Sequence, residues 1–209
     1  MKLAFPALVA LSFSCTPPSA STAPNAGTPP SPNSTTAPSV DVPSTTSASV
    51  PSRPPSAGGD TTGDGLVGKP APDFTTTAHD GTVVHLAALH GKPVVVYFYP
   101  KDETPGCTKE ACSFRDAWQR IAKTGAVLLG VSADSRESHL AFALHYNLPF
   151  LLLSDPDGTI ARLYDVPFEG HHQRQTFVIG TDGTVHNVYR RVDVTVHAAQ
   201  ILEDLRHAN

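Results

Sequence analysis

The sequence has few charged residues, few sulfur-containing residues and no long apolar run. Charged residues make up 16% of the 209 positions, and the formal net charge is −4. This balance lacks the basic excess of a nucleic-acid-binding surface, so we expect no nucleic-acid partner. The apolar run 3–13 at the N-terminus is too short to span a bilayer. Cysteine occurs three times, at Cys15, Cys107 and Cys112.

The N-terminus has the pattern of an export signal. Lys2 precedes the apolar run 3–13, and a basic start followed by a short apolar stretch is typical of secretory signals. Cys15 resembles the lipidated cysteine of bacterial lipoproteins, although Ser and Phe stand three and two positions before it instead of Leu and a small residue. We therefore predict a signal peptide of the lipoprotein type at 1–15, in a protein exported to the bacterial periplasm or cell envelope. An ordinary signal with an incidental cysteine is the alternative.

The segment after the signal is low in complexity. Of the 44 residues in 16–59, 34 are Pro, Ser, Thr or Ala, and 11 of the chain's 20 prolines lie there. Such a segment buries too little apolar surface to offset the entropy of ordering it. We expect a disordered linker over 16–65 and one domain over 66–209, which is long enough for a single sizeable core.

Within the domain, strand-like and helix-like patterns alternate. The run 94–99 is continuous β-branched and aromatic sequence, as in a strand buried on both faces. In the helix predicted at 135–146, Leu140, Ala143 and Leu144 are expected to point inward. The order predicts an α/β fold with a mixed central β-sheet covered by helices on both faces, in a thioredoxin-like arrangement. Strands are expected at 82–86, 94–99, 126–131, 150–153, 176–179 and 184–189, and helices at 107–123, 135–146, 195–206 and in a short segment ending at 163.

A reactive cysteine is expected where the central strand leads into the first long helix. Pro105 and Gly106 turn the chain, and the helix is predicted to start at Cys107. Unpaired backbone N–H groups and the positive end of the helix dipole favour a thiolate there, and the thiolate is the nucleophilic form. The alternative is that Cys107 is a small buried apolar residue, as free cysteines often are.

The second cysteine of this segment, Cys112, favours the chemical interpretation. In an ideal helix, residues five apart have Cα atoms about 8.7 Å apart. A disulfide needs a separation below about 7 Å, so Cys107 and Cys112 cannot bond while the helix is intact. A bond between them is therefore expected to be transient and to require unwinding of the first helical turns.

Several segments resemble the peroxiredoxin family. Pro100, Thr104 and Cys107 match the signature P-x-x-x-T-x-x-C, and the string Thr-Pro-Gly-Cys-Thr-Lys-Glu-Ala-Cys at 104–112 resembles the bacterioferritin-comigratory or peroxiredoxin Q subfamily. The resemblance covers nearly the whole domain. Its other matching segments are 67–74, 153–158 and 174–179.

The resemblance implies a role for each matched residue. Cys107 would be the peroxidatic cysteine, and Cys112 would resolve its oxidised form as a disulfide. Thr104 would hydrogen-bond the thiolate and the peroxide, Pro100 would shield the pocket from water, and Arg174 would stabilise the thiolate and polarise the peroxide. Glu110 also matches a position of the subfamily.

The resemblance further implies a thiol peroxidase that reduces hydrogen peroxide and organic hydroperoxides. Sulfur carries the redox change, so no metal, flavin or haem is expected. Thioredoxin or a similar dithiol would reduce the disulfide, the chain would be a monomer, and its only membrane contact would be the lipid on Cys15. His171 and His172 are interpreted as loop histidines, because no cluster of other ligands accompanies them.

Two other functions are known for thioredoxin-like folds. A membrane-anchored thiol–disulfide oxidoreductase would carry C-x-x-C, and the sequence has none. A copper-carrying protein of thioredoxin fold would carry C-x-x-x-C with a distant histidine, whereas the spacing from Cys107 to Cys112 is one residue longer. A dependence on peroxide distinguishes the peroxidase from the first, and retention of copper would identify the second.

Overall fold

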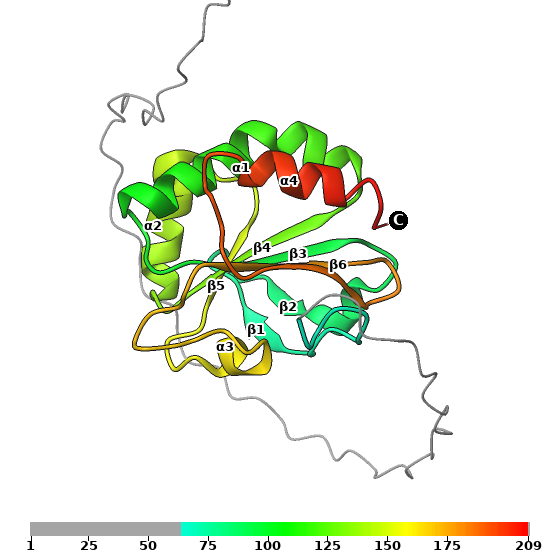
Figure 1. Ribbon diagram of the computed structural model, residues 1–209. Helices are drawn as coiled ribbons and strands as arrows, with labels where there is room; N and C mark the ends of the chain where they lie inside the picture. The colour runs from blue at the N-terminus through cyan, green and yellow to red at the C-terminus, as the bar shows by residue number, and fades with distance from the viewer. Residues whose placement is uncertain (1–63, 209) are drawn as a thin grey trace, which may run out of the picture. The chain divides into compact units, whose positions relative to one another are not determined.

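The computed structural model describes residues 64–208, so the predicted signal at 1–15 and nearly all of the linker 16–65 lie outside the described residues. A five-stranded sheet has the order β5-β4-β3-β6-β7 (Figure 1). The strands β4 and β5 run parallel to the central β3, and β6 and β7 continue the sheet in antiparallel pairing. The predicted α/β fold with a mixed central sheet is confirmed. The strands are β3 (Val94–Phe98), β4 (Val127–Ser132), β5 (Leu151–Ser154), β6 (Gln175–Ile179) and β7 (Val185–Tyr189).

Helices and a small hairpin cover the two faces of this sheet. Figure 1 shows α1 and α4 side by side over one face, and α3 with the β1–β2 hairpin at the other. None of the helices in the described part of the chain is both long and apolar enough to cross a bilayer. These elements are α1 (Pro105–Lys123), α2 (Arg136–Tyr146), α3 (Thr159–Leu163), α4 (His197–Asp204), β1 (Thr75–Thr77), β2 (Val83–His85) and the short 3-10 helix Leu86–Leu89.

The central strand β3 separates two apolar cores. Its side chains alternate between the faces, and all five are buried. Val95 and Tyr97 pack with the core under α1, α2 and α4, whereas Val94, Val96 and Phe98 pack with the core on the α3 side. A strand that is buried on both faces has a near-continuous apolar sequence, which is why its position was predictable.

A glycine in β4 allows Tyr97 to lie across the sheet. Gly130 is the register partner of Tyr97. A Cβ at Gly130 would lie 2.7 Å from the Tyr97 ring and 2.7 Å from Leu152, closer than packed atoms approach. The Tyr97 ring instead lies 5.1 Å from that of Phe114 on α1. The missing side chain therefore sets how closely α1 packs on the sheet.

One predicted helix face is wrong. In α2, Leu140 and Leu144 are 41% and 68% exposed, although both were expected to point inward. The inward residues are His139, Phe142 and Ala143. The apolar periodicity was misleading because a histidine occupies a core position, where hydrogen bonds satisfy it. The hairpin strand β1 and the 3-10 helix were not predicted at all.

Candidate active site

Cys107 lies in the first turn of α1, as predicted, but the helix begins two residues earlier than expected. Pro105 is the first helical residue, a position that suits proline because its missing N–H would have no partner there. The first intrahelical hydrogen bond runs from the Thr108 N–H to the Thr104 carbonyl, at 2.8 Å. The N–H groups of Gly106 and Cys107 precede it and have no partner within the helix. The Cys107 thiol is free and buried, and it lies at the positive end of the helix dipole.

Arg174 is brought to this cysteine by strand pairing. It directly precedes β6, whose first residue, Gln175, pairs with Phe98 at the end of β3. One terminal nitrogen of Arg174 donates to Cys107 Sγ at 3.1 Å. Burial would lower the pKa of Arg174, but the Glu110 and Cys107 side chains beside it outweigh burial and raise that pKa. The guanidinium is therefore a permanent positive charge at the sulfur.

The other terminal nitrogen of Arg174 donates to Glu110 Oε2. Glu110 lies on α1, one turn after Cys107, and its side chain is only 1% exposed. Burial raises the pKa of Glu110 to about 7 even though the charge and hydrogen bond of Arg174 lower it. Its other oxygen, Oε1, is buried without a hydrogen-bond partner. The Arg174 guanidinium thus donates to two groups, the Cys107 thiol and the Glu110 carboxyl, that can each carry a negative charge.

Neutral groups surround the far side of Glu110. His197 on α4 places Nε2 3.9 Å from Glu110 Oε1, too far for a hydrogen bond, and 2.9 Å from Thr176 Oγ1. Burial lowers the pKa of His197 to about 4, so its ring is neutral. Tyr97 lies in the same core, and burial followed by the charge of Glu110 raises its pKa well above the ordinary value.

The other three predicted site residues lie around Cys107. Thr104 occupies the N-cap position of α1 and makes no cap bond with its side chain; its hydroxyl donates to the Lys101 carbonyl at 2.9 Å. Pro100 is half-buried at the start of the loop that follows β3. Cys112 is buried in α1, which is continuous across both cysteines.

A buried network that the sequence did not reveal fixes the loop before α1. Asp102 accepts hydrogen bonds from Tyr99 Oη at 2.8 Å and from Ser138 Oγ at 2.8 Å, and its Oδ2 lies 2.9 Å from His139 Nδ1. The other ring nitrogen of His139 faces the Leu153 carbonyl at 3.3 Å. The His139 ring is therefore held between Asp102 and Leu153 by both of its nitrogens.

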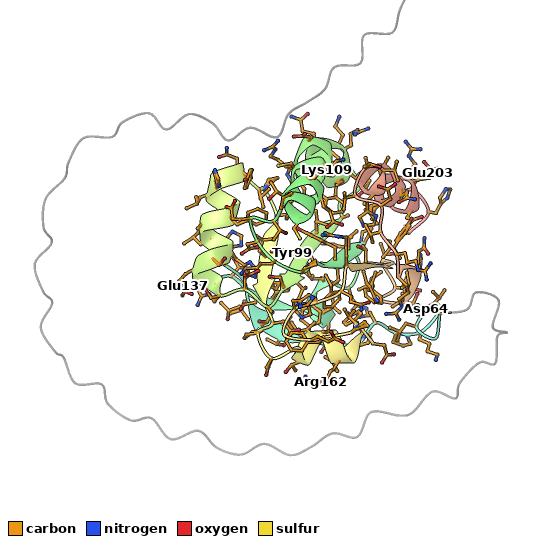
Figure 2. The ribbon with its side chains drawn as sticks, turned by 60° about the vertical axis from the view of Figure 1, so that its left-hand side comes forward. Asp64, Tyr99, Lys109, Glu137, Arg162 and Glu203 are labelled. Atoms are coloured by element: carbon orange, nitrogen blue, oxygen red, sulfur yellow. The ribbon has the colours of Figure 1, made fainter. Side chains whose placement is uncertain are left out.

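A second contact joins the same loop to α2. Glu103 has a φ of 59°, unusual for a residue with a side chain, and its carboxylate lies 3.0 Å from His145 Nδ1. The loop is therefore held at two adjacent residues by two sites on one helix. Figure 2 shows Tyr99 inside the domain, whereas Glu137 on α2 and Lys109 on α1 project outward.

The two adjacent histidines both lie in the loop between α3 and β6, as predicted, but they differ in burial. His171 is exposed, but His172 is fully buried, with Nε2 2.9 Å from Asp155 Oδ2. Asp155 also accepts backbone hydrogen bonds from Ile160 and Ala161, each at 3.0 Å, at the start of α3. Across residues 64–208, no group of three or more His, Cys, Asp or Glu side chains is placed to hold a metal ion.

A second arginine supports the strand that follows Arg174. Arg190 donates to Gln175 Oε1 at 2.5 Å and to Asp64 Oδ2 at 2.6 Å. Its guanidinium carbon also lies 5.1 Å from the centroid of the Phe177 ring. These contacts fix the start of β6, so they fix the backbone from which Arg174 reaches Cys107.

Comparisons with known proteins identify the family of this chain. The model of the AhpC/TSA family matches residues 67–188. A bcp peroxiredoxin of Coxiella burnetii is 44% identical over 144 residues, which are 65% of this chain and 95% of that protein. The chloroplastic peroxiredoxin Q of Sedum lineare is 44% identical over 146 residues, which are 65% of this chain and 78% of that protein.

Solved structures give the same result. The bacterioferritin comigratory protein of Xanthomonas campestris, reported with an alkyl peroxide reduction activity, is similar with a TM-score of 0.61 and 37% identity over 65% of this chain and 92% of that one. Nothing in these comparisons favours a thiol–disulfide oxidoreductase. The chain therefore belongs to the AhpC/TSA family, as an enzyme of its peroxiredoxin Q and bacterioferritin-comigratory group.

Proposed function

We propose that this peroxiredoxin reduces hydrogen peroxide and alkyl hydroperoxides through Cys107. The Cys107 thiolate attacks the terminal peroxide oxygen, an S–O bond forms and the O–O bond breaks, and water or an alcohol leaves. The observation that carries the proposal is the 3.1 Å contact between the Arg174 guanidinium and Cys107 Sγ at a helix N-terminus. Both features stabilise negative charge on sulfur. The alkyl peroxide activity reported for the Xanthomonas campestris relative supports the choice of substrate.

Thr104 and Pro100 complete the proposed peroxide pocket. The Thr104 hydroxyl donates its hydrogen to the Lys101 carbonyl. The hydroxyl oxygen can therefore still accept a hydrogen bond from a peroxide O–H. Pro100 has no N–H of its own and lies half-buried between β3 and the loop, where it would limit access of water to the thiolate. Thr104→Val, which removes the acceptor and keeps the shape, is expected to slow peroxide reduction.

Cys112 is proposed to resolve the sulfenic acid. Its sulfur attacks that of Cys107, a disulfide forms and water leaves. Because α1 is continuous from Pro105 to Lys123, its first turns must unwind before these cysteines meet. The segment that must unwind is bounded by two anchored positions: Asp102, which contacts His139 before the helix, and Phe114, which is fully buried within it. We therefore place the unwinding between them, over 105–112.

The test is peroxide consumption with a dithiol reductant by three serine variants of the full chain. Cys107→Ser is expected to abolish consumption. Cys112→Ser is expected to react once, gain one oxygen and then turn over slowly. Cys15→Ser is the matched control, since Cys15 lies outside the signature at 100–107, and it is expected to behave as the parent does. Full turnover by Cys107→Ser would overturn the proposal.

The resolving step has a separate readout. Mass spectrometry after one equivalent of peroxide is expected to find a disulfide between Cys107 and Cys112 in the parent protein. A disulfide between other cysteines, with peroxidase activity intact, would leave Cys107 as the nucleophile and remove Cys112 from its role. Thioredoxin and a thioredoxin-like domain would then be compared as reductants at equal concentration.

We also propose that the enzyme acts outside the cytoplasm as a monomer. The support is the predicted signal at 1–15 and the linker at 16–65. Mass spectrometry of protein taken from the native membrane fraction is expected to find lipid on Cys15, and light scattering of the delipidated chain is expected to give the mass of one copy. Recovery of an unprocessed chain from the cytoplasm would contradict export.

A further inference from the structure

Cys107 and Glu110, two groups that can each lose a proton, share the positive charge of Arg174 in the active site. This sharing affects how many protons the site holds. Arg174 donates to Cys107 Sγ with one terminal nitrogen and to Glu110 Oε2 with the other. Both acceptors are buried, and the guanidinium side chain is 18% exposed. A thiolate and a carboxylate together would leave this small buried pocket with a net charge of −1. An unbalanced buried charge is costly, so the pocket favours one proton shared between the two groups.

In the part of the chain that the structure describes, no positive group other than Arg174 compensates for Glu110. The charged and titratable side chains that face it are Cys107 on its own helix, Tyr97 on β3, Arg174 before β6 and His197 on α4. The Tyr97 hydroxyl is neutral and has no hydrogen-bond partner. His197 Nε2 is hydrogen-bonded to Thr176, and its ring remains uncharged because burial holds its pKa near 4. Among residues 64–208, Arg174 is therefore the single positive charge for both acids.

The orphaned oxygen of Glu110 supports the neutral form. Oε1 is buried, lacks a hydrogen-bond partner and lies 3.9 Å from the nearest histidine nitrogen. An ionised carboxylate would have negative charge on this unsatisfied oxygen, whereas a protonated one would not. Burial raises the pKa of Glu110 to about 7, and a neighbouring thiolate competing for Arg174 would raise it further.

We propose that Glu110 holds one proton while Cys107 is a thiolate and releases it when Cys107 becomes a sulfenic acid. The inference rests on the proposed peroxidase reaction. The thiolate attacks the terminal peroxide oxygen, the S–O bond of the sulfenic acid forms and the O–O bond breaks. The rest of the peroxide leaves as an alkoxide, or as hydroxide when the substrate is hydrogen peroxide. This product takes up one proton, and Glu110 gives one up through the solvent that reaches Arg174. The pocket is neutral before the step, as thiolate, neutral acid and guanidinium, and neutral after it, as sulfenic acid, carboxylate and guanidinium.

The same exchange runs in reverse when the enzyme is reduced. Attack by Cys112 expels water, and a dithiol then regenerates both cysteines as thiols. The Cys107 thiol passes its proton to the Glu110 carboxylate, which restores the starting state. Glu110 acts through Arg174 and is not proposed to touch the substrate. Its effect is to keep the number of protons in the pocket matched to the redox state of the sulfur.

The test counts protons during a single oxidation of the full chain. Cys112→Ser stops the reaction at the sulfenic acid. A pH indicator in weakly buffered solution then reports proton uptake at a pH about one unit above the pKa of about 7 that Glu110 has without a thiolate beside it, so that Glu110 ionises once Cys107 is oxidised. Ultraviolet absorbance verifies that Cys107 starts as a thiolate. Close to zero protons per peroxide are expected in this variant. In the double variant with Glu110→Gln, which keeps an acceptor for Arg174, one proton per peroxide is expected.

The outcomes separate this inference from the proposed function. If mass spectrometry shows no added oxygen, the peroxidase assignment fails. If oxygen is added and the Cys112→Ser variant takes up one proton from a thiolate start, the assignment holds and the role of Glu110 is wrong. Should the Glu110→Gln protein not react, infrared difference spectra of the Cys112→Ser variant with carbon-13-labelled glutamate decide. A protonated carboxyl band must disappear on oxidation, and its absence before oxidation would overturn the inference.

Discussion

Two buried carboxylates in this domain have opposite properties. Asp155 has both oxygens satisfied, by the N–H groups of Ile160 and Ala161 and by His172. Burial would raise the pKa of Asp155, but these hydrogen bonds outweigh it and lower that pKa. Glu110 shares Arg174 with a thiol and leaves one oxygen unsatisfied, and burial raises its pKa to about 7. Burial alone does not distinguish a structural carboxylate from one that exchanges protons; the completeness of its hydrogen bonding does.

Removal of Arg174 is expected to have the largest effect. Arg174→Met removes the donor to Cys107 and should lower kcat/KM for peroxide roughly 1,000-fold, the loss seen when a donor to a reacting anion is deleted. It also leaves Glu110 buried without a charge partner. Adding Glu110→Gln should recover stability without recovering activity. Recovery of both would show that Arg174 acts only by neutralising Glu110.

The fully bonded carboxylate is expected to matter for stability alone. In Asp155→Asn, an amide nitrogen would face an N–H donor and the hydrogen bonds that the buried carboxylate makes would be weakened, so the free energy of unfolding in urea should fall by about 3 kcal/mol. Peroxide reduction per folded molecule should not change. The control is Asp157→Asn, an exposed aspartate nearby, which should change stability by less than about 0.5 kcal/mol. Loss of activity in folded Asp155→Asn would remove the distinction between the two carboxylates.

The two carboxylates should also respond to pH in opposite directions. The folded pKa of Glu110, about 7, lies above its ordinary value of 4.5. Its stabilising contribution is therefore complete below about pH 4.5 and is lost as pH rises through about 7, by roughly 3 kcal/mol. The lowered pKa of Asp155 gives a contribution that is present above its ordinary value of 3.8 and lost as pH falls below it. Urea unfolding of the parent and of Glu110→Gln across this range should diverge as pH rises.

The smallest effect is expected at His171. Its side chain is exposed, so His171→Ala should change unfolding free energy by less than about 0.5 kcal/mol. His172→Ala leaves Asp155 without its ring partner and should cost several times more. Thermal unfolding of both variants makes the comparison, and equal effects would mean that the buried pair contributes no net stability.

Sequence predicted the parts of this molecule that depend on neighbours in the chain. The strand around Val95 and the helix carrying Cys107 follow from local patterns, and the start at Pro105 follows from proline's preference for the first helical turn. The role of Arg174 came from family resemblance. The pairs that position the site join residues far apart in the chain, such as Asp102 with His139.

The misassigned face of α2 shows why such pairs are hard to predict. His139 occupies a core position because Asp102, 37 residues earlier, receives its ring hydrogen. Because histidine is polar, the apolar periodicity treats position 139 as part of the exposed face of the helix. The pattern therefore predicts the buried face around Leu140 instead. The available signal was spacing: His139, Phe142 and Ala143 follow the i, i+3, i+4 pattern of one helix face.

Gly130 takes no part in the reaction, yet the lack of space around it implies that almost no other residue can replace it. A methyl group there would overlap the far ends of the Tyr97 and Leu152 side chains, each at 2.7 Å, and both side chains are buried in the packed core. Displacement of Tyr97 would move Phe114 and with it the helix that carries the nucleophile. A saturation library selected for survival under peroxide should therefore accept almost no replacement at this glycine, as at the cysteine itself.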